Sequence, residues 1–141
     1  MLEQYYIYDT EKLLKNLNNA RRTLRNLERQ YADLDGARAM DYSNEKVCSS
    51  PSKDRMELIA IQRANLKLKI NRYKRDIELV DKCINALPED EQIALNEFFI
   101  RNPESKQSAV VKLCDKLALE QSAVYSLRRK ALRDFERLLF G

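Results

Sequence analysis

Residues 110–139 read VVKLCDKLALEQSAVYSLRRKALRDFERLL and decide the fold expected for the C-terminal part of the chain. In the first part of this stretch, Val110, Val111 and Cys114 recur at helical spacing before a tight break at Ala118 and Leu119. A second amphipathic run follows the break, with these apolar positions on one face: Val124, Leu127, Ala131, Phe135 and Leu138. Two short helices joined by a tight turn are typical of a helix-turn-helix.

A third short helix is expected just before these two. The segment 88–91 reads PEDE, and a proline followed by acidic residues is typical of the first turn of a helix. The apolar positions that follow end before the pair Asn102-Pro103, which stops a helix or begins the next element. Residues 88–141 are therefore predicted to form a small three-helix helix-turn-helix domain.

Residues 1–87 carry a different pattern, in which apolar residues alternate three and four positions apart. This heptad spacing is typical of long helices that pair through a narrow seam. Because such a stripe cannot bury itself, we expect an all-α fold in which residues 1–87 form a long antiparallel coiled-coil hairpin, with or without a second subunit. The seam positions are Leu13, Leu17, Ala20, Leu24, Leu27, Tyr31 and Leu34, then Met56, Ile59, Arg63, Leu66, Ile70, Tyr73, Ile77, Val80, Ile84 and Leu87.

Two segments of this hairpin leave alternatives open. The long connecting loop expected near residues 35–54 is either a contact site or a plain connection. The second helix has six basic and no acidic residues from Arg63 to Arg75. This stretch either contacts phosphate or an acidic protein surface, or forms a solvated basic face whose aliphatic stems cover the seam.

The composition excludes most classes of enzyme. The 141 residues include no histidine, the commonest general base and metal ligand, and only two glycines, too few for a glycine-rich phosphate loop. The isolated Cys48, Cys83 and Cys114 favour a reduced compartment over a disulfide framework. No apolar run approaches the roughly 18 residues of a membrane span. We therefore expect a protein that is not an enzyme, has no cofactor or metal, and lies outside the membrane.

The last helix carries the candidate binding residues opposite its apolar face. The net charge is only +4, but no acidic residue lies between Gln121 and Arg133. With the start of this helix in a major groove, four side chains are placed to reach base edges: Gln121, Ser122, Tyr125 and Ser126. Five basic residues are candidates for phosphate contacts: Lys106, Arg128, Arg129, Lys130 and Arg133. Alternatively, cations near the end of a helix complement its dipole and keep it hydrated.

Three segments of the chain are similar to parts of one known domain. They are LPEDEQIALNEFF (87–99), VVKLCDKLAL (110–119) and EQSAVYSLRRKALRDFERL (120–138). These resemble the first helix, the supporting helix with its turn, and the recognition helix of region 4 of bacterial sigma factors. That family usually has glycine where this chain has Ala118, and a left-handed conformation there would cost alanine about 1 kcal/mol. The heptads and the sigma-like end together resemble phage-encoded late-gene regulators of the ArpU and RinA type.

The resemblance implies a small transcriptional activator of a phage or prophage. It would act on late genes in the cytoplasm of a bacterial host and bind double-stranded promoter DNA. The coiled coil would hold a homodimer together or contact RNA polymerase. The alternative function is an adaptor that does not bind DNA and instead binds RNA polymerase or another transcription protein through its helices.

Overall fold

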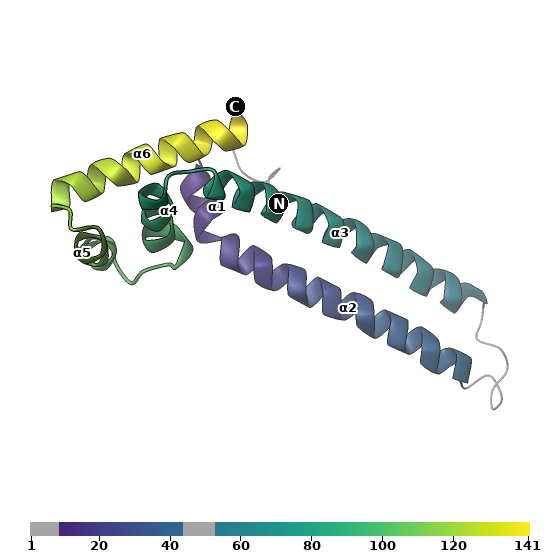
Figure 1. Ribbon diagram of the computed structural model, residues 1–141. Coiled ribbons are helices and arrows are strands. Elements are labelled where there is room, and N and C mark those ends of the chain that lie inside the picture. Colours follow the sequence, from purple (N-terminus) through teal and green to yellow (C-terminus); the bar gives the residue numbers. More distant parts are fainter. Residues whose placement is uncertain (1–8, 44–52) are drawn as a thin grey trace. The chain divides into compact units, whose positions relative to one another are not determined.

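The computed structural model describes residues 9–43 and 53–141, and these are helical without a strand, which confirms the all-α class. None of the helices in these ranges has an apolar stretch that could cross a membrane. In chain order (Figure 1), the elements are α1 (Thr10–Lys15), α2 (Leu17–Ser43), α3 (Lys53–Asn85), α4 (Glu89–Leu95), the π-helical turn η3 (Asn96–Ile100), α5 (Lys106–Leu117) and α6 (Gln121–Phe140).

The chain divides into two compact units. The first takes in Met1–Ala20 and Asp76–Gly141, and the second is Arg21–Arg75. The first unit therefore includes, besides residues 88–141, the described start of the chain and the last turns of α3. The helix-turn-helix prediction for residues 88–141 did not anticipate these two additions, which supply part of the core described next.

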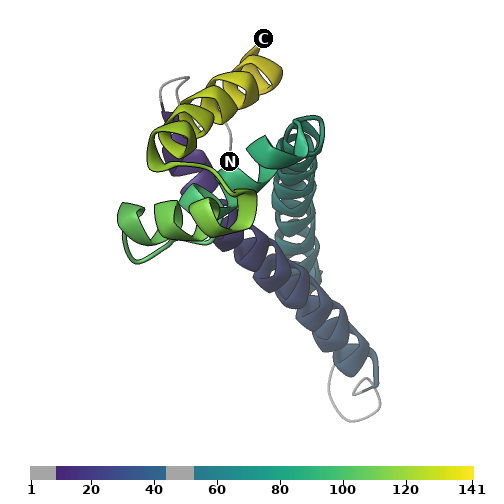
Figure 2. The same cartoon turned by 60° about the vertical axis from the view of Figure 1, so that its left-hand side comes forward.

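The core of the first unit forms where α6 packs against α4, α5 and α1. Figure 2 shows α6, in yellow, passing beside α1, in purple. Phe99 of η3 and Phe135 of α6 are fully buried, together with Leu14 of α1. Most of the apolar positions expected inward are buried, but Val111 and Leu138 are about half exposed, at 54% and 47%. Leu14 lies outside the heptad seam, and it is buried because α1 packs against η3 and α6.

A π-helical turn, η3, follows α4 directly. The Arg101 backbone N–H donates to the Asn96 carbonyl at 3.0 Å, across five residues instead of four. The last four of its five residues, 97–100, are all buried, whereas a helix at a protein surface buries only one apolar face. Asn18 and Asn102 then fix this turn to the start of the chain. The Asn18 amide donates to the Ile100 carbonyl at 2.9 Å, and the Asn102 amide donates to the Lys15 carbonyl at 3.0 Å.

The second unit consists of an antiparallel pair formed by α2 and α3. Tyr31 and Arg63, both expected in the seam, contact each other: the Arg63 guanidinium lies 5.1 Å from the centre of the Tyr31 ring and donates to its hydroxyl at 3.1 Å. Lys67 lies over the same ring at 5.6 Å. Further along, Lys74 pairs with Glu28 at 3.5 Å. The seam is half-buried at Leu34 and Leu66 and exposed at Met56. Coiled-coil packing of this pair stays a prediction.

Helix α2 runs further than the sequence pattern predicts. The pattern predicts a connection from about residue 35, whereas α2 continues through Gly36 to Ser43 and α3 begins at Lys53. A glycine inside a helix costs about 1 kcal/mol relative to alanine, but Ala37, Ala39 and Met40 are strong helix formers that favour its continuation. The rest of the expected connection, including Cys48, lies outside the described residues.

Candidate nucleic-acid interface

The turn between α5 and α6 determines where α6 begins. Helix α5 starts after Ser105, whose hydroxyl accepts a hydrogen bond from the Ser108 backbone N–H at 3.1 Å. It ends at Ala118, which has φ 53° and ψ 42°, in the left-handed region. A left-handed residue directly after a helix turns the chain away from the helix axis. The three residues 118–120 therefore connect the two helices, in agreement with the expected tight break.

Helix α6 has an apolar face and an outward face. The apolar face is buried through Val124, Leu127, Ala131 and Phe135. Four exposed residues, spaced four, three and four apart, make up what we call the outward row of α6: Ser122, Ser126, Arg129 and Arg133. Within this row, the Arg129 guanidinium donates to the Ser126 hydroxyl at 3.4 Å. Two hydroxyls near the start of the helix and two cations further along therefore share one exposed, acid-free face.

The four residues predicted to face bases are not equivalent in the structure. Gln121, Ser122 and Ser126 are exposed in the first two turns of α6. Tyr125 is half-buried and packs against the hydrophobic core of the first unit. Three of the four side chains are thus exposed to a ligand, and Tyr125 only in part.

Four of the five predicted phosphate contacts are exposed. They are Lys106, at the first position of α5, and Arg129, Lys130 and Arg133 on α6. Lys130 lies beside the outward row and pairs with Glu91 of α4 at 3.7 Å, with its own side chain 69% exposed. Glu91 is buried, but the Lys130 ammonium at the other end of this long contact is open to solvent and can reach a second anion.

Arg128 is placed differently from the other cations of α6. Its side chain is only 14% exposed, and its guanidinium lies 3.2 Å from the Glu11 carboxylate of α1. The same guanidinium stacks on two rings of the core, 5.4 Å from the centre of Phe98 and 5.0 Å from that of Phe99. The prediction of a phosphate contact at Arg128 is therefore not supported by its position, because the side chain holds α6 against α1 and η3.

Two buried carboxyl groups border the site and differ in their surroundings. Burial raises the pKa of Glu91, and the neighbouring Asp134 raises it further, against the charge of Lys130. Burial also acts to raise the pKa of Glu97, but the hydrogen bond from Lys116 and the charges of Arg101 and Lys112 lower it below its ordinary value. Glu97 lies 2.6 Å from Lys116 and 3.0 Å from Arg101. These two cations therefore serve the fold of the first unit.

One exposed cation extends the outward row and was not among the predicted contacts. Arg137 follows Arg133 by four residues and is exposed in the last turn of α6. The signal for it was present in the sequence, since residues four apart share a helix face. A cation near the C-terminal end of a helix also interacts favourably with the helix dipole. Because this is a second reason for a basic residue at position 137, the spacing alone does not identify Arg137 as a DNA contact.

The described residues contain no group of three or more acidic or cysteine side chains that could hold a metal ion. Burial raises the pKa of the Cys83 thiol, and the charge of Lys82 opposes this shift. Cys83 is buried in the core of the first unit. Cys114 is half-buried and packs against the same core. No protein-family model matches the chain, and neither a curated protein nor a solved structure does.

Proposed function

We propose that this protein is a transcription regulator that binds double-stranded DNA with the outward row of α6. The observation that carries the proposal is the acid-free, exposed face on which Ser122 and Ser126 precede Arg129 and Arg133. Hydroxyls and amides recognise base edges, whereas arginines bind phosphates and fix the protein on the duplex. A helix that carries the first kind of group at its start and the second kind further along is suited to entering a major groove by its N-terminal end.

The remaining elements have roles consistent with this function. The left-handed turn at Ala118 between α5 and α6 is consistent with a helix-turn-helix in which α6 is the second helix, and Lys106 at the start of α5 is a candidate phosphate contact in it. Arg128 is left out of the DNA contacts, since it is engaged with Glu11. The resemblance of residues 87–138 to region 4 of bacterial sigma factors supports DNA binding, and the resemblance of the whole chain to phage late-gene regulators of the ArpU and RinA type suggests activation of late genes.

The test is selection of bound duplexes from a random DNA pool by the full chain at near-physiological salt, followed by sequencing. We expect enrichment of one motif. Replacing Gln121 or Ser126 by alanine should weaken the preferred duplex by about 1 kcal/mol and relax the preference at single positions. Replacing Arg133 by alanine should weaken all duplexes alike and reduce the slope of log K against log salt by about one.

A matched control removes an exposed cation elsewhere. Arg22→Ala, at an exposed position of α2, should leave both the motif and the salt slope unchanged. Recovery of duplexes without any enriched motif would reduce the proposal to nonspecific binding. Equal loss of affinity for Arg22→Ala and Arg133→Ala would contradict the assignment to α6.

The second candidate is an adaptor that binds RNA polymerase or another transcription protein through its helices. The observation in its favour is the exposure of large apolar side chains on α3, among them Leu58 and Leu68. Apolar side chains grouped on one surface mark protein contacts more often than DNA contacts. Failure to bind any duplex, combined with capture of polymerase subunits, would favour the adaptor.

A further inference from the structure

The positive charge of the chain is concentrated in its second unit. Residues 21–75 carry 14 basic and 7 acidic side chains, whereas the rest of the chain carries 12 and 15. The net charge of +4 therefore combines +7 in the second unit with −3 in the first. Attraction of a polyanion depends on such local charge more than on the total. Because α6 belongs to the unit with the negative balance, the second unit is the more attractive of the two for a polyanion.

Within the second unit, the cations gather where two helical segments lie side by side. Residues 21–31 of α2 and 63–75 of α3 carry ten basic side chains and a single acidic one, Glu28. The Lys74 ammonium of the second segment lies 3.5 Å from the Glu28 carboxylate of the first. Two further cations of the second segment contact the ring of Tyr31 in the first. The two basic segments are therefore adjacent.

Two rows of residues share the flank on which Glu28 contacts Lys74, and each row is spaced four and three residues apart. We call them the basic face, and they consist of Arg21, Arg25 and Glu28 on α2 and of Lys67, Asn71 and Lys74 on α3. Arg21 is half-buried and the other five are exposed. On α3 the face ends before Glu78, which follows Lys74 by four residues. The basic face thus presents four cations and one carboxylate.

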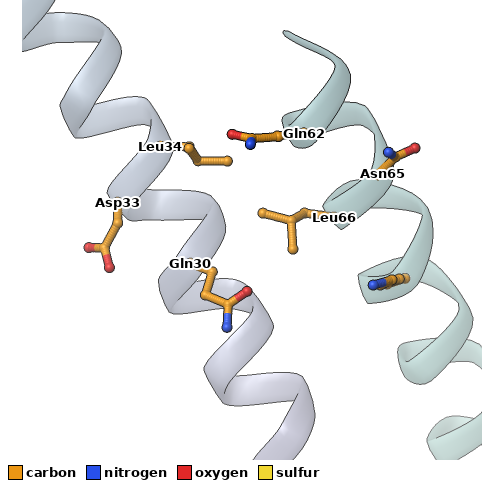
Figure 3. Close-up of a pocket in the computed structure, with 7 residues that line it drawn as sticks. Gln30, Asp33, Leu34, Gln62, Asn65 and Leu66 are labelled. Carbon is orange, nitrogen blue, oxygen red and sulfur yellow. The ribbon is translucent and has the colours of Figure 1, made fainter. Parts of the chain in front are cut away.

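The opposite flank of the helix pair is built differently. It holds an open groove of about 620 Å³, and Figure 3 shows Leu34 of α2 and Leu66 of α3 pointing towards one another across it. The groove is lined by one acidic and one basic side chain, Asp33 and Lys69, and otherwise by amides and leucines. The groove therefore has no net charge, and the excess of cations lies outside it.

The cations of the basic face repel one another across the helix pair. Flanking positions of paired helices usually carry opposite charges that attract each other, and like charges at such positions are destabilising. Here cations occupy both rows, with Arg25 on α2 and Lys67 on α3, and Glu28 is the single acidic residue of the face. An anion bound over the face would relieve this repulsion.

The chemistry of the basic face favours the backbone of a duplex over other polyanions. None of its six residues is apolar, and the exposed Leu58 and Leu68 of α3 lie outside it. Protein interfaces have an apolar core that is depleted of charge, whereas a phosphate backbone needs only cations and hydrogen-bond donors. Single-stranded nucleic acid binds by stacking on aromatic rings, but Arg63 and Lys67 cover the Tyr31 ring.

We propose that the basic face binds the phosphate backbone of double-stranded DNA, independently of base sequence. The identity of the ligand rests on the proposed function, and the basic face adds a contact that α6 does not make. In this division, α6 supplies the sequence preference, and the second unit supplies affinity that is equal for all duplexes and falls with salt.

The test is binding of the full chain to the selected duplex and to a duplex of unrelated sequence, at salt concentrations from about 50 to 200 mM. The double variant Arg25→Gln with Lys67→Gln should weaken both duplexes by the same factor and leave the selected motif unchanged. It should reduce the slope of log K against log salt by about two, so that the affinity lost over this range is about tenfold smaller than in the wild type. Circular dichroism checks that the variant stays helical.

Two single variants complete the test. Glu28→Gln should strengthen both duplexes, because it removes the carboxylate that occupies Lys74, and misfolding cannot produce such a gain. The matched control is Arg22→Gln. Arg22 is exposed and lies two residues from the seam positions Ala20 and Leu24, on the side of α2 that faces away from α3. It should change neither the affinity nor the salt slope.

The outcomes separate this inference from the proposed function. Preference for the selected duplex with an unchanged salt slope in the double variant would overturn the basic face and leave the proposed function intact. Equal binding of both duplexes that the double variant weakens would support the basic face and contradict sequence reading by α6. A chain that binds neither duplex would overturn both. Binding of poly-glutamate that the double variant loses, with DNA binding unchanged, would overturn the DNA contact and assign the face to an acidic protein.

Discussion

The Arg128 guanidinium lies 3.2 Å from the Glu11 carboxylate, and through this pair α6 is joined to α1 across most of the sequence. The charge of Arg128 is also placed over the rings of Phe98 and Phe99, where a cation interacts favourably with aromatic faces. Around the same position, the Thr10 hydroxyl donates to the Glu136 carboxylate. The contact between α1 and α6 thus combines these polar interactions with apolar side chains that are buried in the core, such as Leu14 and Phe135.

Replacing Arg128 by alanine should therefore destabilise the fold. We expect a loss of about 1–2 kcal/mol in the free energy of unfolding, from the cation-aromatic contacts and the partly exposed ion pair together. Urea unfolding followed by circular dichroism measures this loss. The neighbouring Arg129→Ala, at an exposed position, should change stability by less than about 0.5 kcal/mol while weakening DNA binding. An Arg128→Ala variant of unchanged stability that no longer binds DNA would instead make Arg128 a phosphate contact.

The environment of Arg128 could not be predicted from the sequence. Its position within a basic run is visible in the sequence, but its burial depends on α1, which lies more than a hundred residues away along the chain. The outward row of α6 is predictable, because it needs only the helical period and the apolar face opposite it. This is why the exposure of Arg129 and Arg133 could be predicted from the sequence, whereas the burial of Arg128 could not.

The helical elements were predictable to different degrees for the same reason. The starts of α4 and α5 follow from local signals, the proline at 88 and the capping Ser105. The π-helical turn η3 depends on a core that surrounds residues 97–100 and has no local signal. In the sequence, Arg63 is only a charged residue that interrupts an apolar seam. Its contact with Tyr31 could not be predicted, because it depends on how α2 and α3 lie side by side.

Glu97 should stabilise the fold as a carboxylate. It is 1% exposed and accepts a hydrogen bond from Lys116 at 2.6 Å. We expect Glu97→Gln to lose about 1–2 kcal/mol of unfolding free energy at pH 7, since hydrogen bonds to charged groups contribute more than neutral ones. Because the pKa of Glu97 is lower in the folded than in the unfolded chain, this contribution is complete above its ordinary pKa of 4.5. It is lost as the pH falls through the folded-state value.

Urea unfolding of the wild type and of Glu97→Gln between pH 7 and pH 3 measures this dependence. The difference between the two should be largest at pH 7 and should shrink as the pH falls. Glu104→Gln serves as the control, because it removes a carboxylate at an exposed position outside this ion-pair cluster. A difference between wild type and Glu97→Gln that stays constant with pH would mean that packing, and not charge, explains the loss.

Glu91 should behave in the opposite way. Its carboxyl group is buried next to the carboxyl group of Asp134, and Lys130 lies 3.7 Å away. Burial raises its pKa, so the folded state holds the proton more tightly than the unfolded state does. The contribution of Glu91 to the free energy of unfolding is therefore complete below the ordinary pKa of 4.5. It declines as the pH rises through the raised pKa of the folded state.

Glu91→Gln should accordingly be more stable than the wild type at pH 7, by on the order of 1 kcal/mol, because it removes a buried charge. The gain should disappear below pH 4.5, where the wild-type carboxyl is already neutral. Thermal unfolding at several pH values measures both effects. A Glu91→Gln variant that is less stable at pH 7 would show that the attraction of Lys130 outweighs the cost of burial.

Ala118 is the residue at which a single substitution should stabilise the turn before α6. With φ 53° and ψ 42°, it occupies a conformation that only glycine adopts without steric cost. Ala118→Gly should raise the free energy of unfolding by about 0.5–1 kcal/mol, since the relief of strain exceeds the entropy that glycine adds to the unfolded chain. Ala118→Val should lower it, because a β-branched side chain tolerates this conformation less well than alanine. Urea unfolding of the three proteins gives the order. A loss of stability in Ala118→Gly would mean that the methyl group of Ala118 contributes more to the fold than its backbone conformation costs.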